Sequence, residues 1–228
     1  IPCFLLLSFL LGSACQAKET SGQKPVALPM VLLGTWQVTA VLLDQGDSHW
    51  NQTRDDKFNS HEYLGRIFRL GPERITYNGP YSETCEEPKV IVHRTTIATM
   101  VSTNMTSRFS DSTPTPSDFR LPLGDNTPIE VFSMLCKNGR FYLKGLGRSS
   151  SNVDGAWFTV LAKDKLMLRW SGETFLILRP LLDNATPAAS FDCAKSATAV
   201  ENTLCSSVAL AAYDQSVSKT YKSALAYF

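Results

Sequence analysis

The chain lacks the short patterns that mark common enzyme classes. Its 228 residues contain no G-x-S-x-G elbow, no H-E-x-x-H helix, no C-x-x-C pair and no Walker-type phosphate loop. The three histidines are His49, His61 and His93, and they fall in unrelated segments. We expect ordinary surface histidines there, rather than a metal site built from His49, His61 and Glu62. The sequence therefore predicts no enzymatic activity, no metal and no cofactor.

The chain also lacks an excess of charge of either sign. It has 22 Lys and Arg against 21 Asp and Glu, a formal net charge of +1, and no basic cluster that could release counterions from a phosphate backbone. We therefore expect no nucleic-acid partner. The length is enough for one mid-sized domain and a small one, and a hydrophobic content of 43% is enough for a core.

The apolar run at the start of the chain is too short to cross a membrane. Residues 4–14 are eleven uncharged residues, whereas a spanning helix needs about 20. Such a run, followed by polar sequence, is typical of an export signal, here residues 1–17. It can end in a loose lipobox with Cys15 lipidated, or in ordinary cleavage near Ala17. A buried N-terminal helix of a cytosolic protein is the remaining alternative. We expect a bacterial envelope protein anchored to a membrane by lipid on Cys15.

The chain has only six cysteines. If Cys3 leaves with the signal and Cys15 carries lipid, an even set suited to an oxidising compartment is left: Cys85, Cys136, Cys193 and Cys205. A bridge between Cys85 and Cys136 would close a loop of about 50 residues and stabilise the fold by about 4 kcal/mol in the chain-entropy model.

Residues 25–181 have the pattern of an antiparallel β domain. Alternating apolar residues between turn signals predict strands at 34–43, 66–70, 74–77, 89–99, 129–136, 141–146, 156–162, 165–170 and 174–179. In the first of them, we expect Trp36, Val38, Ala40 and Leu42 on one face. Eight or nine such strands favour a small barrel or a strongly curled sheet. Residues 102–128, rich in Ser, Thr, Pro and Asp, are expected to form a long rim loop.

Gly34-x-Trp36 on the first strand and Arg179 on the last resemble the lipocalin and calycin pattern. The resemblance implies that Arg179 packs over the Trp36 indole and closes one end of the barrel. It also implies that the barrel can carry a small apolar ligand. The alternative is a β domain of another kind that begins with a core Trp.

Residues 190–228 have the pattern of a small helical module. Thr198 and Glu201 form a capping box that starts a short helix ending near Cys205. Ser206 and Ser207 offer a second N-cap, followed by apolar residues at helical spacing: Leu210, Tyr213, Val217, Tyr221, Ala224 and Phe228. On one continuous helix Cys193 and Cys205 would be about 18 Å apart, too far for a disulfide. A loop before Thr198 can instead fold back and bring them together.

The module resembles the N-terminal domain of the lysozyme inhibitor LprI family. The matching residues are Phe191, Asp192, Cys193, Ala194, Lys195, Glu201, Cys205, Leu210, Asp214 and Tyr221. The resemblance implies that the module binds a lysozyme and blocks its cleft. Because the disulfide pins the loop beside Cys193, we expect residues 192–197 to make the contact, with Asp192 first and Lys195, Glu201 and Asp214 as further contacts. Because domains of this family continue with a further helix and a closing Cys, we expect the module to be truncated.

The charges of the module also allow a purely structural interpretation. Asp192, Glu201 and Asp214 lie toward helix starts, and Lys219 and Lys222 lie toward a helix end, which complements helix dipoles without any partner. The sequence thus predicts an α+β protein, a β-barrel-like domain of 8–9 strands followed by a disulfide-stapled helical module. Its expected function is lysozyme inhibition. The alternatives are a lipocalin-like carrier with an accessory module and a structural protein that recognises peptidoglycan or another lipoprotein.

Overall fold

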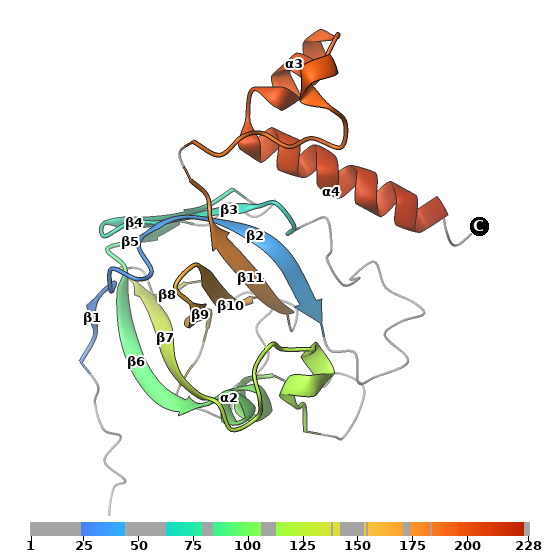
Figure 1. Cartoon of the computed structure of the whole chain (residues 1–228). Coiled ribbons are helices and arrows are strands. Elements are labelled where there is room, and N and C mark those ends of the chain that lie inside the picture. The colour runs from blue at the N-terminus through green and yellow to red at the C-terminus, as the bar shows by residue number, and fades with distance from the viewer. Residues whose placement is uncertain are drawn as a thin grey trace, which may run out of the picture.

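A single curled antiparallel sheet carries a small helical module on one side (Figure 1). The computed structural model describes residues 24–43, 63–78, 84–105, 113–137, 139–141, 153, 155–170, 174–182 and 184–225. Within them it confirms the predicted fold class, a β-barrel-like domain followed by a disulfide-stapled helical module.

The elements follow one another in a simple order along the chain. The strands are β1 (Val26–Ala27), β2 (Gly34–Leu43), β3 (Ile67–Leu70), β4 (Arg74–Tyr77), β5 (Thr84–Glu86), β6 (Lys89–Thr96), β7 (Pro128–Cys136), β8 (Gly139–Arg140), β9 (Trp157–Ala162), β10 (Lys165–Trp170) and β11 (Thr174–Pro180). The α-helices are α2 (Ile97–Asn104), α3 (Ala199–Cys205) and α4 (Val208–Leu225), and the 3-10 turns are η1 (Pro116–Phe119) and η2 (Cys193–Lys195). Eight of the nine predicted strands are found, and β5, which was not predicted, is a further strand longer than two residues.

A disulfide links β5, at one end of the curled sheet, to β7 near the other end. The strand order is β1-β6-β7-β9-β10-β11-β2-β3-β4-β5, with β8 paired to β7 off this path. Cys85 on β5 bonds to Cys136 on β7, with 5.1 Å between their Cα atoms. Beside it, the Lys137 N–H donates to the Glu86 carbonyl at 2.8 Å. The predicted Cys85–Cys136 bridge is confirmed, and it makes the seam of the barrel.

The middle strands bury side chains on both faces of the sheet. On β10, Leu166, Leu168 and Trp170 belong to a core cluster that gathers residues from strands all round the sheet. Met167, which points to the other face, belongs to a second cluster under α2 and η1. Helical cover on the outer face therefore buries these strands on both faces, and the alternating strand pattern gave no sign of this cover.

A β-bulge changes the expected facing of β2. The register with β11 pairs Ala40 with Ile177 but Val38 with Leu178, so Thr39 is the extra residue. As a result, Val41 follows Trp36 and Val38 into the first cluster. The prediction that Ala40 and Leu42 share the face of Trp36 is wrong, because both contact the second cluster.

The strand predicted at 89–99 ends earlier than expected. The Thr96 side chain accepts a hydrogen bond from the Thr99 N–H and starts α2, so 97–99 are helical. The predicted rim loop 102–128 is also partly wrong. It contains the end of α2 and the turn η1, and Phe119 is only 1% exposed. The described parts of this segment cover the second cluster.

A buried arginine closes the C-terminal end of α2. Arg169, on β10, is 1% exposed. Its Nη2 donates to the Asn104 carbonyl at 2.8 Å and its Nη1 donates to the Gly155 carbonyl at 3.4 Å. A cation beside the last carbonyls of a helix also meets the negative end of the helix dipole. Arg169 therefore ties the covering helix to the sheet.

Several predicted features lie outside the described residues. These are the export signal 1–17 with Cys3 and Cys15, the histidines His49 and His61, residues 106–112 of the rim segment, and residues 142–146 of the strand predicted at 141–146.

Candidate functional site

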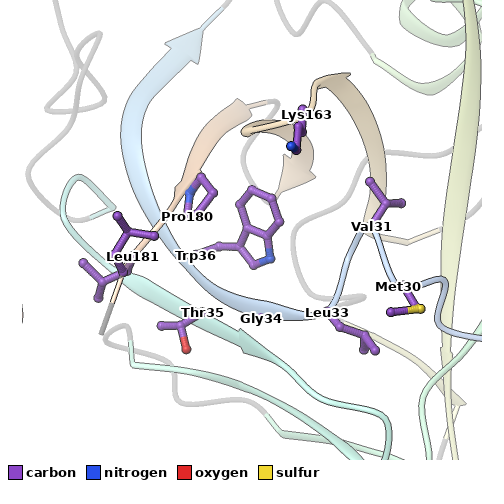
Figure 2. A pocket seen from close by; sticks show the side chains of 10 residues that line it. Met30, Val31, Leu33, Gly34, Thr35, Trp36, Lys163, Pro180 and Leu181 are labelled. Atoms are coloured by element: carbon purple, nitrogen blue, oxygen red, sulfur yellow. The ribbon is translucent and has the colours of Figure 1, made fainter. Parts of the chain in front are cut away.

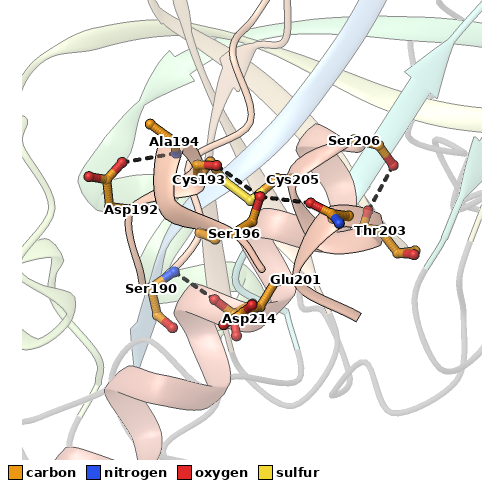
Figure 3. Close-up of a disulfide and its surroundings, with 12 residues drawn as sticks. Ser190, Asp192, Cys193, Ala194, Ser196, Glu201, Thr203, Cys205, Ser206 and Asp214 are labelled. Atoms are coloured by element: carbon orange, nitrogen blue, oxygen red, sulfur yellow. Dashed lines mark hydrogen bonds between the residues drawn. A yellow bond between two sulfur atoms is a disulfide. The ribbon is translucent and has the colours of Figure 1, made fainter. Parts of the chain in front are cut away.

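Residues 192–197 form a corner at the start of the helical module, and a disulfide holds this corner against α3. Cys193 in η2 bonds to Cys205 at the end of α3, with 5.6 Å between the Cα atoms. The loop at 196–198 turns the chain back so that η2 lies against α3, as Figure 3 shows. The predicted Cys193–Cys205 bridge is therefore confirmed, together with the fold-back before Thr198 that it required.

The capping box at the start of α3 is formed as predicted. The Glu201 carboxylate accepts from the N–H groups of Ala197 and Thr198, each at 2.9 Å. The Glu201 N–H donates to the Thr198 hydroxyl at 3.1 Å. These backbone hydrogen bonds lower the pKa of Glu201, because they favour its charged form. Glu201 therefore has a structural use whether or not it contacts a partner.

Asp192 and Lys195 lie together at the exposed tip of the corner. Asp192 accepts from the Ala194 N–H at 3.0 Å and so caps η2. Its other oxygen is 3.6 Å from the Lys195 ammonium, and the side chains are 55% and 83% exposed, respectively. The tip thus presents one acid and one base to solvent on a fixed backbone.

Asp214 has a structural contact that the sequence did not indicate. Its carboxylate accepts from the Ser190 N–H at 2.6 Å, and the Gln215 amide beside it donates to the Ala189 carbonyl at 3.4 Å. These bonds fasten residues 189–190 to α4, and Figure 3 shows the bond between Ser190 and Asp214. Of the four predicted contact residues, only Asp192 and Lys195 share the exposed tip, while the carboxylates of Glu201 and Asp214 bind backbone groups.

Small residues let α4 dock closely on the β domain. A Cβ placed on Gly65, whose φ is +81°, would lie 3.0 Å from the Ala212 Cβ and 3.2 Å from the Ala212 carbonyl oxygen. Next to it, Ala211 is fully buried. Position 65 therefore needs glycine for both its backbone conformation and the approach of the helix.

The docked face of α4 differs from the expected one. Tyr213 does pack, since the Arg66 guanidinium lies 4.4 Å from its ring centroid and its hydroxyl donates to the Asn78 carbonyl at 3.4 Å. Tyr221 and Val217, in contrast, are each 63% exposed. The helical spacing in the sequence groups Tyr221 with Tyr213 and predicts that both pack, but this is wrong for Tyr221, because Ala211, Ala212 and Tyr213 make the contact with the β domain.

The cation expected over Trp36 points elsewhere. In the β2–β11 register Pro180 is opposite Trp36, whereas Arg179 is opposite Gln37 and so faces the other side of the sheet. Arg179 pairs with Asp164 instead. Trp36 is fixed by a hydrogen bond from its indole N–H to the Leu32 carbonyl at 2.9 Å.

An open apolar groove lies beside Trp36, at the point where β11 ends. Its volume is about 760 Å³ (Figure 2). The lining residues are Met30, Val31, Leu33, Gly34, Thr35, Trp36, Lys163, Pro180, Leu181 and Leu182. All side chains in this set are apolar except those of Thr35 and Lys163.

The space enclosed by the strands is filled by aromatic side chains. The rings of Phe68 and Tyr77 stack with centroids 4.4 Å apart, and both meet the Trp170 ring edge-on at 5.2 Å. A ligand in this place would have to displace these rings. The small apolar ligand expected from the lipocalin resemblance stays a prediction.

The described part of the chain holds no group of three or more His, Cys, Asp and Glu residues that could bind a metal ion. Nor does it hold a helix with the length and apolar character needed to cross a membrane. No model of a known protein family matches the chain, and searches among curated proteins and solved structures gave no match.

Proposed function

We propose that this chain is an exported protein of the bacterial cell envelope that binds a lysozyme through the corner 192–197 and blocks its glycan-binding cleft. The observation that carries the proposal is the exposed, disulfide-pinned tip with Asp192 at its end. The resemblance of this module to lysozyme inhibitors of the LprI family supports the choice of partner.

Rigidity is the first property that an inhibitor of this kind needs. Binding a flexible loop costs about 1–2 kcal/mol for each backbone residue that becomes fixed. Here the disulfide, the Asp192 cap and the Glu201 capping box fix the corner before any partner arrives. Little further ordering would oppose binding.

Charge is the second property. An acidic side chain at the tip suits a basic enzyme cleft, and the exposed Asp192 carboxylate can offer its oxygens there. Lys195, 3.6 Å away, competes for the same carboxylate within the free protein. We expect the Asp192 side chain to leave Lys195 when it meets a cationic group of the enzyme.

Export places such an inhibitor where lysozyme acts. The proposed lipid on Cys15 would anchor the chain to a membrane and keep the module on the periplasmic side. Changing Cys15→Ser should abolish labelling by a lipid precursor and release the protein into the soluble fraction. Cleavage near Ala17 with unchanged fractionation would argue for secretion without an anchor.

The direct test is lysis of a peptidoglycan suspension by a c-type lysozyme in the presence of the full chain. Asp192→Asn keeps a side-chain oxygen for the cap but removes the charge, so it should weaken inhibition about tenfold or more without unfolding the corner.

Asp164→Asn is the matched control, since Asp164 is also an exposed acid with a basic partner, 60% exposed, but lies on the β domain. This variant should inhibit as the unmodified chain does. If the full chain neither binds lysozyme nor slows lysis, or if Asp164→Asn weakens inhibition as much as Asp192→Asn does, the proposal is wrong.

A further inference from the structure

Three apolar side chains in the groove beside Trp36 are exposed to solvent. Met30 is 88% exposed, Leu182 is 64% exposed and Val31 is 42% exposed, and all three line the 760 Å³ groove. Clusters of exposed apolar side chains are uncommon on soluble proteins and often mark binding sites. Figure 2 shows Met30 and Val31 on one side of the indole and Pro180 and Leu181 on the other.

The size and shape of the groove suit a small molecule. Ligand pockets commonly have volumes of about 300–1,000 Å³, and this groove lies within that range. Its floor is rigid because the Trp36 indole N–H bonds to the Leu32 carbonyl and the ring is only 4% exposed. The groove is open along one side, so a flexible, elongated ligand can enter without a change in the fold.

One cation marks one end of the groove. Among the described residues that line it, Lys163, in the turn between β9 and β10, is the only charged one. Its neighbour Asp164 pairs with Arg179, and within the described residues Lys163 has no hydrogen-bond or ion-pair partner. An apolar trough with a single available ammonium is complementary to a molecule with an anionic head and one aliphatic chain.

We infer that this groove binds a single-chain anionic amphiphile, with its aliphatic chain along Met30, Val31 and Leu182 and its head group at Lys163. None of the described residues that line the groove belongs to the corner 192–197. The inference therefore does not rest on the proposed lysozyme binding, and either can fail without the other.

The test is calorimetric titration of the full chain with dodecanoate below its critical micelle concentration. We expect one-site binding that weakens with shorter fatty acids, by at most about fourfold for each methylene lost. Dodecyltrimethylammonium, which has the same chain length and the opposite charge, should bind much more weakly. Equal binding of the two probes, or no binding of dodecanoate, would overturn the inference.

Variants separate the two halves of the site. Lys163→Gln should weaken dodecanoate binding about tenfold, and Met30→Glu should do so at least as strongly. The matched controls are Lys219→Gln and Val217→Glu, which change an exposed lysine and an exposed apolar residue on α4. These should bind as the unmodified chain does. If the controls lose as much affinity as the groove variants, the probe binds elsewhere and the inference is wrong.

A membrane surface could offer the same chemistry as a free amphiphile. Vesicles of phosphatidylglycerol and of phosphatidylcholine distinguish the two sources. Binding of monomeric dodecanoate with no groove-dependent binding to either vesicle supports the inference. Groove-dependent binding to phosphatidylglycerol vesicles without binding of monomeric dodecanoate would replace it with a membrane contact.

Discussion

The guanidinium of Arg66 lies over the ring of Tyr213, 4.4 Å from its centroid, and this contact joins the β domain to the helical module. The Tyr213 hydroxyl adds a hydrogen bond to the Asn78 carbonyl. Together with the close approach of Gly65 and Ala212, it makes α4 part of the surface of the barrel rather than a helix on a tether.

Tyr213→Leu should loosen this junction while keeping most of the apolar contact. The loss of a cation–π contact and a partly buried hydrogen bond should cost about 1–2 kcal/mol. We expect faster hydrogen exchange in α4, measured by mass spectrometry, and a lower free energy of unfolding. Tyr221→Leu, on the exposed side of the same helix, should change stability by no more than about 0.5 kcal/mol. Equal effects of the two changes would mean that the junction contributes nothing.

The two disulfides should differ in how much they stabilise the protein. Their sequence separations are 51 residues for Cys85–Cys136 and 12 for Cys193–Cys205. The chain-entropy model then gives about 4 and about 3 kcal/mol, respectively, lost when each pair is changed to Ala. Urea unfolding measures both values.

The local effects of the two changes provide the control. Loss of Cys85–Cys136 should open β5 and speed exchange of the Lys137 amide, because the other described contacts there are the hydrogen bond from the Lys137 N–H to the Glu86 carbonyl and the exposed Lys137–Glu87 ion pair. The exchange of α3 should speed up by no more than the global loss of stability requires, whereas loss of Cys193–Cys205 should do the reverse. Equal local effects of the two changes on β5 and α3 would show that the seam is not a local element.

Arg169→Met should destabilise the protein by about 2–4 kcal/mol in urea unfolding. The change leaves the Asn104 and Gly155 carbonyls without their charged donor in a buried place. Arg94→Met is the comparison, since the Arg94 side chain is 85% exposed and pairs with Glu130. It should cost less than about 1 kcal/mol. A similar small effect at position 169 would contradict a role of Arg169 in fastening α2 to the sheet.

The strand pattern predicted most of the sheet but not what covers it. On β10 the sequence places Met167 and Arg169 on the face opposite Leu168, which suggests a solvent face. That face is buried because α2 lies on it, and α2 itself was hidden by its β-branched residues, which favour strand. A covering element that is missed makes the strands beneath it look half-exposed.

The corner was predictable because its signals are local. The capping box joins Thr198 to Glu201, one helical turn away, and the disulfide joins residues with a sequence separation of 12. These signals therefore define the loop without contacts from distant segments. Two other contacts join segments that are distant in the sequence, so no local spacing predicts them. They are the hydrogen bond from the Ser190 N–H to Asp214 and the close approach of Gly65 to Ala212.

The Glu201 capping box makes the start of α3 sensitive to acid. Its two backbone hydrogen bonds lower the folded-state pKa below the ordinary value of about 4.3. A group with a lowered folded pKa stabilises the fold fully above its unfolded pKa, and that contribution disappears as the pH falls through the folded pKa. We therefore expect the Ala197 and Thr198 amides to exchange faster, and their NMR shifts to move together, only below the ordinary Glu range. Glu201→Gln can still cap the helix but cannot titrate, so the same amides should show no transition there. If the transition persists in that variant, another group controls the corner, and Glu201 is not its acid-sensitive element.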